Sequence, residues 1–205
     1  MRKSLLRMPS RHLHGVAMIE ALVAILILSI GVLGMVGMQS ASIRYEQNSW
    51  ARSAVSMVAS DIGDRIRANA GSANNAYVYT STYADERILI NGGSAFTVSP
   101  DCLSAVCSPA ELATFDLVKW RDNLNRLAPG SVGMVTGSRD TNYNVTVAWF
   151  DKSWLLPPGA PGTTPGLESA PVCEPTMVLA AARNCCPAGL SSPAGVRCVN
   201  FSVLP

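Results

Sequence analysis

The sequence predicts an α+β fold in which one long N-terminal helix packs on a small antiparallel sheet with one further helix. Three observations predict it. A run without charged residues covers 21–43, a stripe of apolar residues at helical spacing follows it, and apolar and polar residues alternate later in the chain. We therefore expect a helix with a membrane half and an amphipathic half, followed by a small domain of separate helical and strand segments.

The uncharged run has the length of a membrane-spanning helix. Its 23 residues extend about 35 Å at about 1.5 Å per residue. A bilayer's hydrocarbon core is about 30 Å thick, so the run is long enough to cross it with some tilt. The basic residues Arg2, Lys3, Arg7 and Arg11 precede it. This order indicates a cytoplasmic N-terminus and places the chain after Ile43 on the outer side.

The net charge of +2 arises in the N-terminal segment. Four basic residues precede Gly15, whereas the rest of the chain has twelve basic and fourteen acidic residues. We therefore expect no basic surface and no nucleic acid partner. All six cysteines follow the apolar run. An even number confined to the exported part predicts disulfides in an oxidising compartment.

Two interpretations compete for residues 1–43. A secretory signal peptide has an apolar core of about 7–15 residues before a small-residue cleavage site. Here the run is longer, and its far end, Met38-Gln39-Ser40-Ala41-Ser42, matches such a site only modestly. The other interpretation places cleavage between Gly15 and Val16, so that the apolar helix stays on the mature protein.

The sequence at that boundary resembles the leader of type IV prepilins and related pseudopilins. Gly15, Val16 and Glu20, followed by ALVAILILSIG, carry the resemblance. It implies a leader over 1–15, cleavage after Gly15 by a prepilin peptidase, N-methylation of Val16, and Glu20 as the carboxylate that acts in filament assembly. The family usually has phenylalanine where this chain has Val16. The resemblance further implies a helix over 16–70 and a pilin-like globular domain over 71–205.

The same resemblance implies partners and a location. The partners are other major and minor pilins, contacted through the N-terminal helix, the prepilin peptidase and the inner-membrane assembly platform; no cofactor is implied. The protein would begin in the inner membrane as a single-pass chain and end in an extracellular pilus.

The position of Glu20 also has a physical interpretation. A carboxylate at the edge of an apolar helix is costly unless it is paired or reaches water. After cleavage the amine of Val16 would lie one turn away on the same face, where Glu20 can neutralise it or a neighbour's amine. Contact with lipid headgroups is the alternative. Gly31, Gly34 and Gly37 indicate either close helix packing or a locally weakened helix.

Helical periodicity continues beyond the apolar run. One stripe predicts a single helix over residues 17–69, ending at Asn69-Ala70-Gly71-Ser72; its members are Ala51, Val55, Val58, Ile62 and Ile66. Residues 71–100 are expected to form a loop with a short strand over 87–90. Ser108, Pro109 and Glu111 then predict a capped helix start. Its expected buried stripe is Ala113, Leu117, Trp120, Leu124 and Leu127, and Pro129-Gly130 ends it.

Strands are predicted over 132–136, 143–150 and 195–203, with a polar turn at 138–142 between the first two. Residues 153–176 contain six prolines and three glycines and predict an exposed loop. The order of a cysteine, a capped helix with Asp116 and Trp120, Leu-x-Pro-Gly and an aromatic-ended strand is also similar to minor pilins of the pilus modification type.

The cysteines are expected to pair in two groups. Cys102 and Cys107 precede the capped helix and are expected to bond across a tight loop. Adjacent cysteines rarely bond to each other, so Cys185 and Cys186 are expected to reach Cys173 and Cys198, in either assignment. A metal site is the weaker alternative, because no histidine follows His14 and C-x-x-C spacing is absent.

No catalytic motif is recognisable. The paired carboxylates, Asp61 with Asp64 and Asp85 with Glu86, are expected to be solvated surface groups. We expect a non-enzyme, a minor type IV pilin that supports pilus assembly or adhesion. The alternatives are a minor pseudopilin of a type II secretion system and, from another class, a signal-anchored periplasmic enzyme.

Overall fold

A computed structural model describes residues 14–93, 96–151, 154 and 166–205. Residues 1–13 of the expected leader lie outside this set, as do residues 153 and 155–165 of the expected proline-rich loop. The chain forms two compact units, Met1–Trp50 and Ala51–Pro205. We call the second unit the head domain. Each unit is described by itself.

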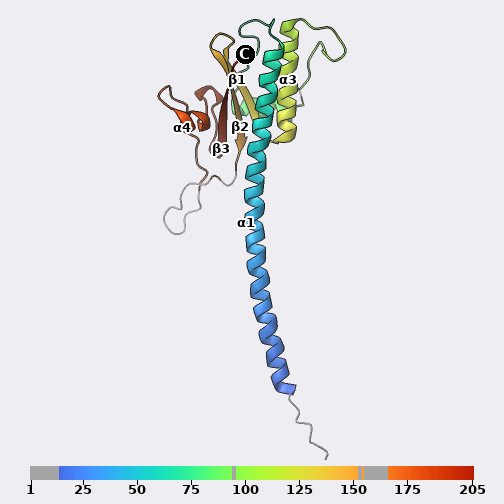
Figure 1. Cartoon of the computed structure of the whole chain (residues 1–205), viewed down its shortest axis with the longest axis vertical. Helices are drawn as coiled ribbons and strands as arrows, with labels where there is room; N and C mark the ends of the chain where they lie inside the picture. Colours follow the sequence, from blue (N-terminus) through green and yellow to red (C-terminus); the bar gives the residue numbers. More distant parts are fainter. Residues whose placement is uncertain (1–13, 94–95, 152–153, 155–165) are drawn as a thin grey trace, which may run out of the picture. The chain divides into compact units, whose positions relative to one another are not determined.

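The first element is the helix α1 (His14–Ala68), drawn from blue to green in Figure 1. It is unbroken at all three glycines of the apolar part, and its bounds confirm the prediction of one continuous helix over 17–69. Within the head domain, Val55, Val58, Ile62 and Ile66 are at most 1% exposed. These are four of the five members of the predicted stripe, and their spacing returns to one helix face every turn. The side chain of the fifth, Ala51, lies outside the described set.

The helix α2 (Tyr83–Asn91) corrects the sequence prediction for residues 71–100. A loop with a strand over 87–90 was expected there, and this was wrong. Thr82 lies in an extended conformation, and its side chain accepts a hydrogen bond from the backbone N–H of Asp85, which caps a helix start. Asp85 and Glu86 then place acidic groups in the first turn, where the helix dipole favours them.

The helix α3 (Pro109–Leu127) begins as the sequence predicts. The Ser108 side chain accepts from the backbone N–H of Glu111, and the Glu111 carboxylate accepts from the backbone N–H of Ser108, which completes a capping box. The backbone bond from Ser108 lowers the pKa of Glu111. The predicted stripe is buried at Ala113, Leu117, Trp120 and Leu124, and Leu127 is partly buried.

Three antiparallel strands form one sheet in the order β1-β2-β3. They are β1 (Val132–Ser138), β2 (Asn142–Phe150) and β3 (Val196–Val203). Each predicted strand is present, and the first is longer than expected by two residues. The structure is therefore α+β, with an N-terminal apolar helix, a small antiparallel sheet and further helices.

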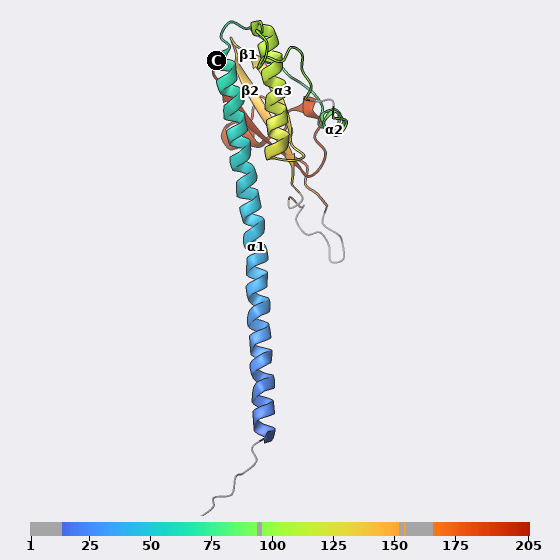
Figure 2. The ribbon, with the colours of Figure 1, turned by 90° about the vertical axis from the view of Figure 1, so that its right-hand side faces the viewer.

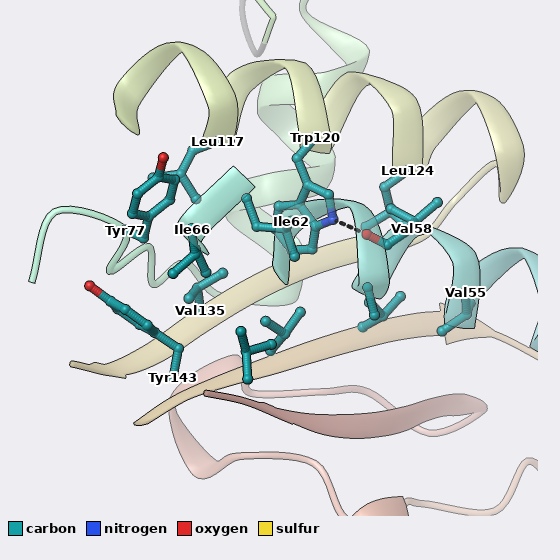
Figure 3. Close-up of a cluster of buried hydrophobic side chains, with 14 of the residues drawn as sticks. Val55, Val58, Ile62, Ile66, Tyr77, Leu117, Trp120, Leu124, Val135 and Tyr143 are labelled. Atoms are coloured by element: carbon teal, nitrogen blue, oxygen red, sulfur yellow. Dashed lines mark hydrogen bonds between the residues drawn. The ribbon is translucent and has the colours of Figure 1, made fainter. Parts of the chain in front are cut away.

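One face of the sheet carries the main core of the head domain. The part of α1 from Ala51 onward and α3 lie side by side over this face (Figures 1 and 2). Trp120 is fully buried between them, and its Nε1 donates to the backbone O of Val58 at 2.9 Å (Figure 3). This bond satisfies the polar end of a large apolar side chain.

The opposite face of the sheet carries a smaller apolar cluster. Its buried members are Val132, Met134, Ala148, Cys186, Leu190, Val196 and Cys198. The short helices α4 (Leu179–Asn184) and η1 (Ala188–Leu190) belong to the segment that covers this face. Neither helix was expected from the sequence.

Candidate functional site

The predicted cleavage and assembly residues lie in the first turns of α1. Gly15 and Val16 are helical, and their side chains are outside the described set. Glu20 is exposed, and no hydrogen bond or ion pair joins it to another residue that the structure describes. Its carboxylate is therefore available to a positive group that comes from a new N-terminus or from another molecule.

The helix around Glu20 is long and apolar enough to cross a membrane. The span Met18–Ser40 has 23 residues and a mean hydropathy of 2.6, and none of its apolar window is buried within the chain. It overlaps the predicted run over 21–43 and contains Glu20 as its one charged residue. A helix that is apolar on every side needs an apolar environment, so this one requires lipid or other helices around it.

Contacts within the described part of the chain do not explain why three positions of this helix are glycine. A Cβ built at Gly31, Gly34 or Gly37 meets no described atom within 4 Å. Backbone geometry gives no reason either, because the helix is regular there. Their small size therefore has its use in contacts outside this chain or in lowering helix stability, the two alternatives that the sequence left open.

A polar network joins α1 to α3 in the head domain. The Asp116 carboxylate is 5% exposed and accepts from Arg65 Nη1 at 2.9 Å and from the Tyr77 hydroxyl at 2.7 Å. Asn69 Nδ2 donates to the same hydroxyl at 3.1 Å. Burial, and then the hydrogen bond to Asp116, raise the pKa of Tyr77, so the hydroxyl stays protonated and donates to the carboxylate.

Arg65 carries the positive charge of this network. Burial alone would lower the pKa of Arg65. The hydrogen bonds to Asp116 and Asp61 and the charges of these carboxylates outweigh this effect and raise the pKa above its ordinary value. Its Nε also donates to Asp61 at 3.1 Å, so Arg65 bridges two carboxylates. Asp61 is half-buried and Asp64 is exposed, so the predicted pair is solvated at Asp64 and ion-paired at Asp61.

A second network corrects the prediction for Asp85 and Glu86. Asp85 is exposed as expected, but Glu86 is only 1% exposed. Arg121 of α3 donates to its Oε1 from Nε at 2.7 Å and lies over the Tyr79 ring at 4.2 Å. The Tyr79 hydroxyl donates to the other carboxylate oxygen. Burial, and then this bond, raise the pKa of Tyr79 to about 12.

Both buried carboxylates serve to hold elements together. Asp116 connects α1 to α3 and Glu86 connects α2 to α3, each through a guanidinium group. The acceptor atoms of a carboxylate held in this way are occupied by donors, which suits structural support better than proton transfer. Within the part of the chain that the structure describes, no group of three or more potential ligands could hold a metal ion.

The six cysteines form three disulfides. Cys102 bonds to Cys107, as expected. Cys173 bonds to Cys185 and Cys186 to Cys198, so the adjacent cysteines reach the other two as expected, and the structure selects one of the two assignments. Cys186 and Cys198 belong to the smaller apolar cluster. The Cys186–Cys198 bond thus fastens the segment that contains α4 to β3, and the Cys173–Cys185 bond joins the two ends of the stretch that includes α4.

Comparison of the chain with profiles of protein families, with curated protein sequences and with solved structures found no significant match. What can be said about function therefore depends on the residues at the start of α1 and on the geometry of the head domain.

Proposed function

We propose that this chain is a minor type IV pilin. It is cut after Gly15 by a prepilin peptidase, methylated at Val16 and incorporated into a pilus, where it supports assembly or adhesion. One observation carries the proposal: Glu20 lies four residues after Val16 in an apolar helix that no described residue of the chain buries.

The chemistry of the cut end supports this proposal. Cleavage after Gly15 would create a positive amine at the start of a helix, where the dipole disfavours positive charge. Glu20 follows at i, i+4 spacing and is exposed, so it is placed to neutralise that amine or the amine of an adjacent subunit. Such pairing would lower the cost of moving both charges from the membrane edge into an apolar filament interior.

The apolar helix supports the proposal in a second way. It would span the inner membrane with the N-terminus in the cytoplasm before assembly, and it would pack among the helices of other major and minor pilins afterwards. Both environments exclude water, which a helix with exposed apolar side chains on all sides requires. The inner-membrane assembly platform and the prepilin peptidase would be its other partners.

Within the family we place the chain with the minor pilin PilV, the type IV pilus modification protein. The resemblance rests on Asp116, Trp120 and the order of elements around them. Both residues are buried and both contact α1, Asp116 through Arg65 and Trp120 through the carbonyl of Val58. They therefore fix the helix that the proposal places in the filament to the rest of the head domain.

The alternative assembly is the pseudopilus of a type II secretion system, which has the same kind of leader. The order of sequence features around Asp116 and Trp120, which resembles that of minor pilins, supports the pilus over the pseudopilus. A signal-anchored enzyme is less favoured, because the buried carboxylates are occupied in ion pairs.

The test is incorporation into filaments. Pili sheared from cells that express the wild type should contain the protein, and a Glu20→Ala variant should be lost from pili while remaining in the membrane fraction. Glu46→Ala is the matched control, because Glu46 is another exposed glutamate of α1, outside the apolar span. Equal incorporation of both variants would contradict the role of Glu20, and detection only in secretion pseudopili would favour the alternative.

A further inference from the structure

The two edges of the sheet differ in how they are covered. β1 is one edge strand, and Tyr79 pairs with it through two backbone hydrogen bonds to Val135, of 2.9 and 2.8 Å. β3 is the other edge strand. Unpaired strand edges offer rows of donors and acceptors to another chain, so the state of the β3 edge determines whether the sheet can grow.

The register shows which groups of β3 face outward. The backbone N–H and C=O of Val135 are both hydrogen-bonded to Tyr79, so they point away from β2. Val145 lies opposite Val135 in a pair without mutual hydrogen bonds, and its backbone groups therefore point toward β3. Phe201 of β3 pairs with Val145, so the backbone N–H and C=O of Phe201 point back toward β2. Along a strand, the backbone groups of consecutive residues point alternately to one side and to the other. Those of Asn200 and Ser202 therefore point away from β2. Neither has a backbone hydrogen-bond partner on that side among the described residues.

A groove of about 910 Å³ lies beside this edge. The Asn200 side chain reaches from β3 to α4 there, and its Nδ2 donates to the backbone O atoms of Ala182 and Cys185 at 2.9 Å each, whereas the backbone groups of Asn200 have no backbone partner on that side among the described residues. Its lining includes Val199 and Phe201, which face the α1 side of the sheet, and Asn200 and Ser202, which face the other side. A hollow that touches both faces of an edge strand must lie beside that edge. The part of α1 from Ala51 onward and α4 form its two walls, and both belong to the head domain.

The groove is mostly apolar and carries one sign of charge. Val55 of α1 contributes to the wall, and Leu179 of α4 is 83% exposed with a backbone φ of 53°, an uncommon conformation for leucine. Among the described residues that line the groove, Arg183 is the only charged one. An occupant should therefore present apolar side chains toward α1 and a carboxylate toward Arg183.

We propose that the outer edge of β3 binds an extended segment of another protein chain as a fourth strand, with a carboxylate of that segment beside Arg183. The edge segment Val199–Ser202 carries no charged residue or proline, two of the features that natural edges use to prevent such pairing. Backbone pairing with pockets for alternate side chains is a common mode of peptide recognition. This interaction goes beyond the proposed function and does not depend on it.

A second copy of this chain is the less suitable occupant. Symmetric pairing of two β3 edges would bring a second Arg183 to the interface and no carboxylate from the groove lining. Like charges near one another are unfavourable, whereas a carboxylate on a different chain would be attracted.

The test uses the full chain in detergent and fluorescein-labelled heptapeptides of alternating valine and threonine, with one aspartate placed in turn at each threonine position. At least one peptide should bind saturably and slow hydrogen exchange at Asn200–Ser202. Ser202→Pro should weaken binding about tenfold, because it removes an outward N–H and leaves the bonds between β2 and β3 intact. Ser202→Ala keeps that N–H and should bind like the wild type.

Charge and backbone are then tested separately. Arg183→Glu should weaken binding of the aspartate peptide by about two- to fivefold and leave a lysine-substituted peptide no weaker. If Ser202→Pro does not fold, a peptide methylated on the amides that face β3 replaces it, and it should bind about tenfold more weakly to the wild type.

Three results would overturn the proposal. The first is no saturable binding of any aspartate peptide to the wild type. The second is unchanged affinity both for folded Ser202→Pro and for the methylated peptide. The third is a wild-type dimer that Ser202→Pro dissociates, since the occupant would then be a second copy.

Discussion

Asp116 is one of the residues that join α1 to α3. Its carboxylate is buried and bound by two donors from segments far apart in the sequence. Asp116→Asn keeps the shape but removes the charge opposite Arg65, whose side chain is one third accessible. We expect the free energy of unfolding to fall by about 1–3 kcal/mol, measured by denaturant unfolding of the full chain in detergent.

Asp64→Asn is the matched control for that substitution. Asp64 also pairs with an arginine of α1, Arg67, at 3.0 Å, but the two side chains are 76% and 52% accessible. Exposed pairs contribute little, so the loss should be below about 0.5 kcal/mol. Equal losses for the two variants would show that the burial of Asp116 has no energetic consequence.

The raised pKa of Tyr79 predicts that the protein loses stability at high pH. This pKa in the folded protein is about 12, above the value of about 10 for an unperturbed tyrosine. The folded state thus holds the proton more tightly, and this contribution to stability is complete below pH of about 10 and is lost as the pH rises toward 12. Unfolding measured between those values should show a steeper loss for the wild type than for Tyr79→Phe.

The difference between the wild type and Tyr79→Phe measures the contribution of the Tyr79 hydroxyl alone. Burial also raises the pKa of Tyr77 and of Tyr83, so part of the loss at high pH remains in the Tyr79→Phe variant. For the Tyr79→Phe variant, the loss of unfolding free energy at high pH should be smaller than for the wild type by an amount on the order of 1–2 kcal/mol. Parallel curves for the two proteins would contradict the assignment of this share to Tyr79.

At the scale of elements, the packing of α3 on β1 depends on the absence of a side chain at Gly133. A Cβ there would lie 2.4 Å from Cη2 of Trp120, which is fully buried. Gly133→Ala should therefore displace the indole, cost about 1–3 kcal/mol of unfolding free energy and shift the tryptophan emission to longer wavelength. Chemical unfolding and fluorescence of the full chain measure both effects.

Gly63→Ala provides the contrast, because the same change on α1 meets only ordinary contacts. The nearest atom would be a methyl group of Val203 at 3.5 Å, and alanine favours a helix over glycine by about 1 kcal/mol. This variant should be as stable as the wild type or more so. A larger loss for Gly63→Ala than for Gly133→Ala would contradict the packing described for these two glycines.

Elements with local signals could be predicted from the sequence. α1 and α3 have apolar stripes and clear ends, and the three strands alternate. α2 could not be found from its apolar residues, because Ile88, Leu89 and Ile90 suggest a strand; the signal that was available is Thr82 followed by Asp85, a helix-capping pattern. The burial of Glu86 depends on Arg121, 35 residues away, which no local pattern reveals.

Pairings between distant residues mark the limit of prediction from the sequence. That Cys185 and Cys186 bond to different cysteines follows from their adjacency, but the choice of Cys173 for Cys185 depends on how the segment with α4 lies against β3. Similarly, Asp116 could be named from a family resemblance, whereas its contacts with Arg65 and Tyr77 required the fold.

For the molecule as a whole, the proposed function depends on where the N-terminal segment is cleaved. Gly15 and Val16 lie in the first turn of α1, shortly before the apolar span Met18–Ser40, and Glu20 is the one charged residue in that span. Cleavage after Gly15 keeps this helix and creates the amine that Glu20 is placed to meet. Cleavage after the span would remove both, and no cleavage would leave the amine at Met1.

The most direct measurement is the intact mass of the protein from the membrane fraction, combined with analysis of its N-terminal residue. The proposed function predicts a chain that begins at N-methylated Val16 and retains the apolar helix. A chain that begins at Met1, or one that begins beyond Ser40 and has lost the helix, would contradict it.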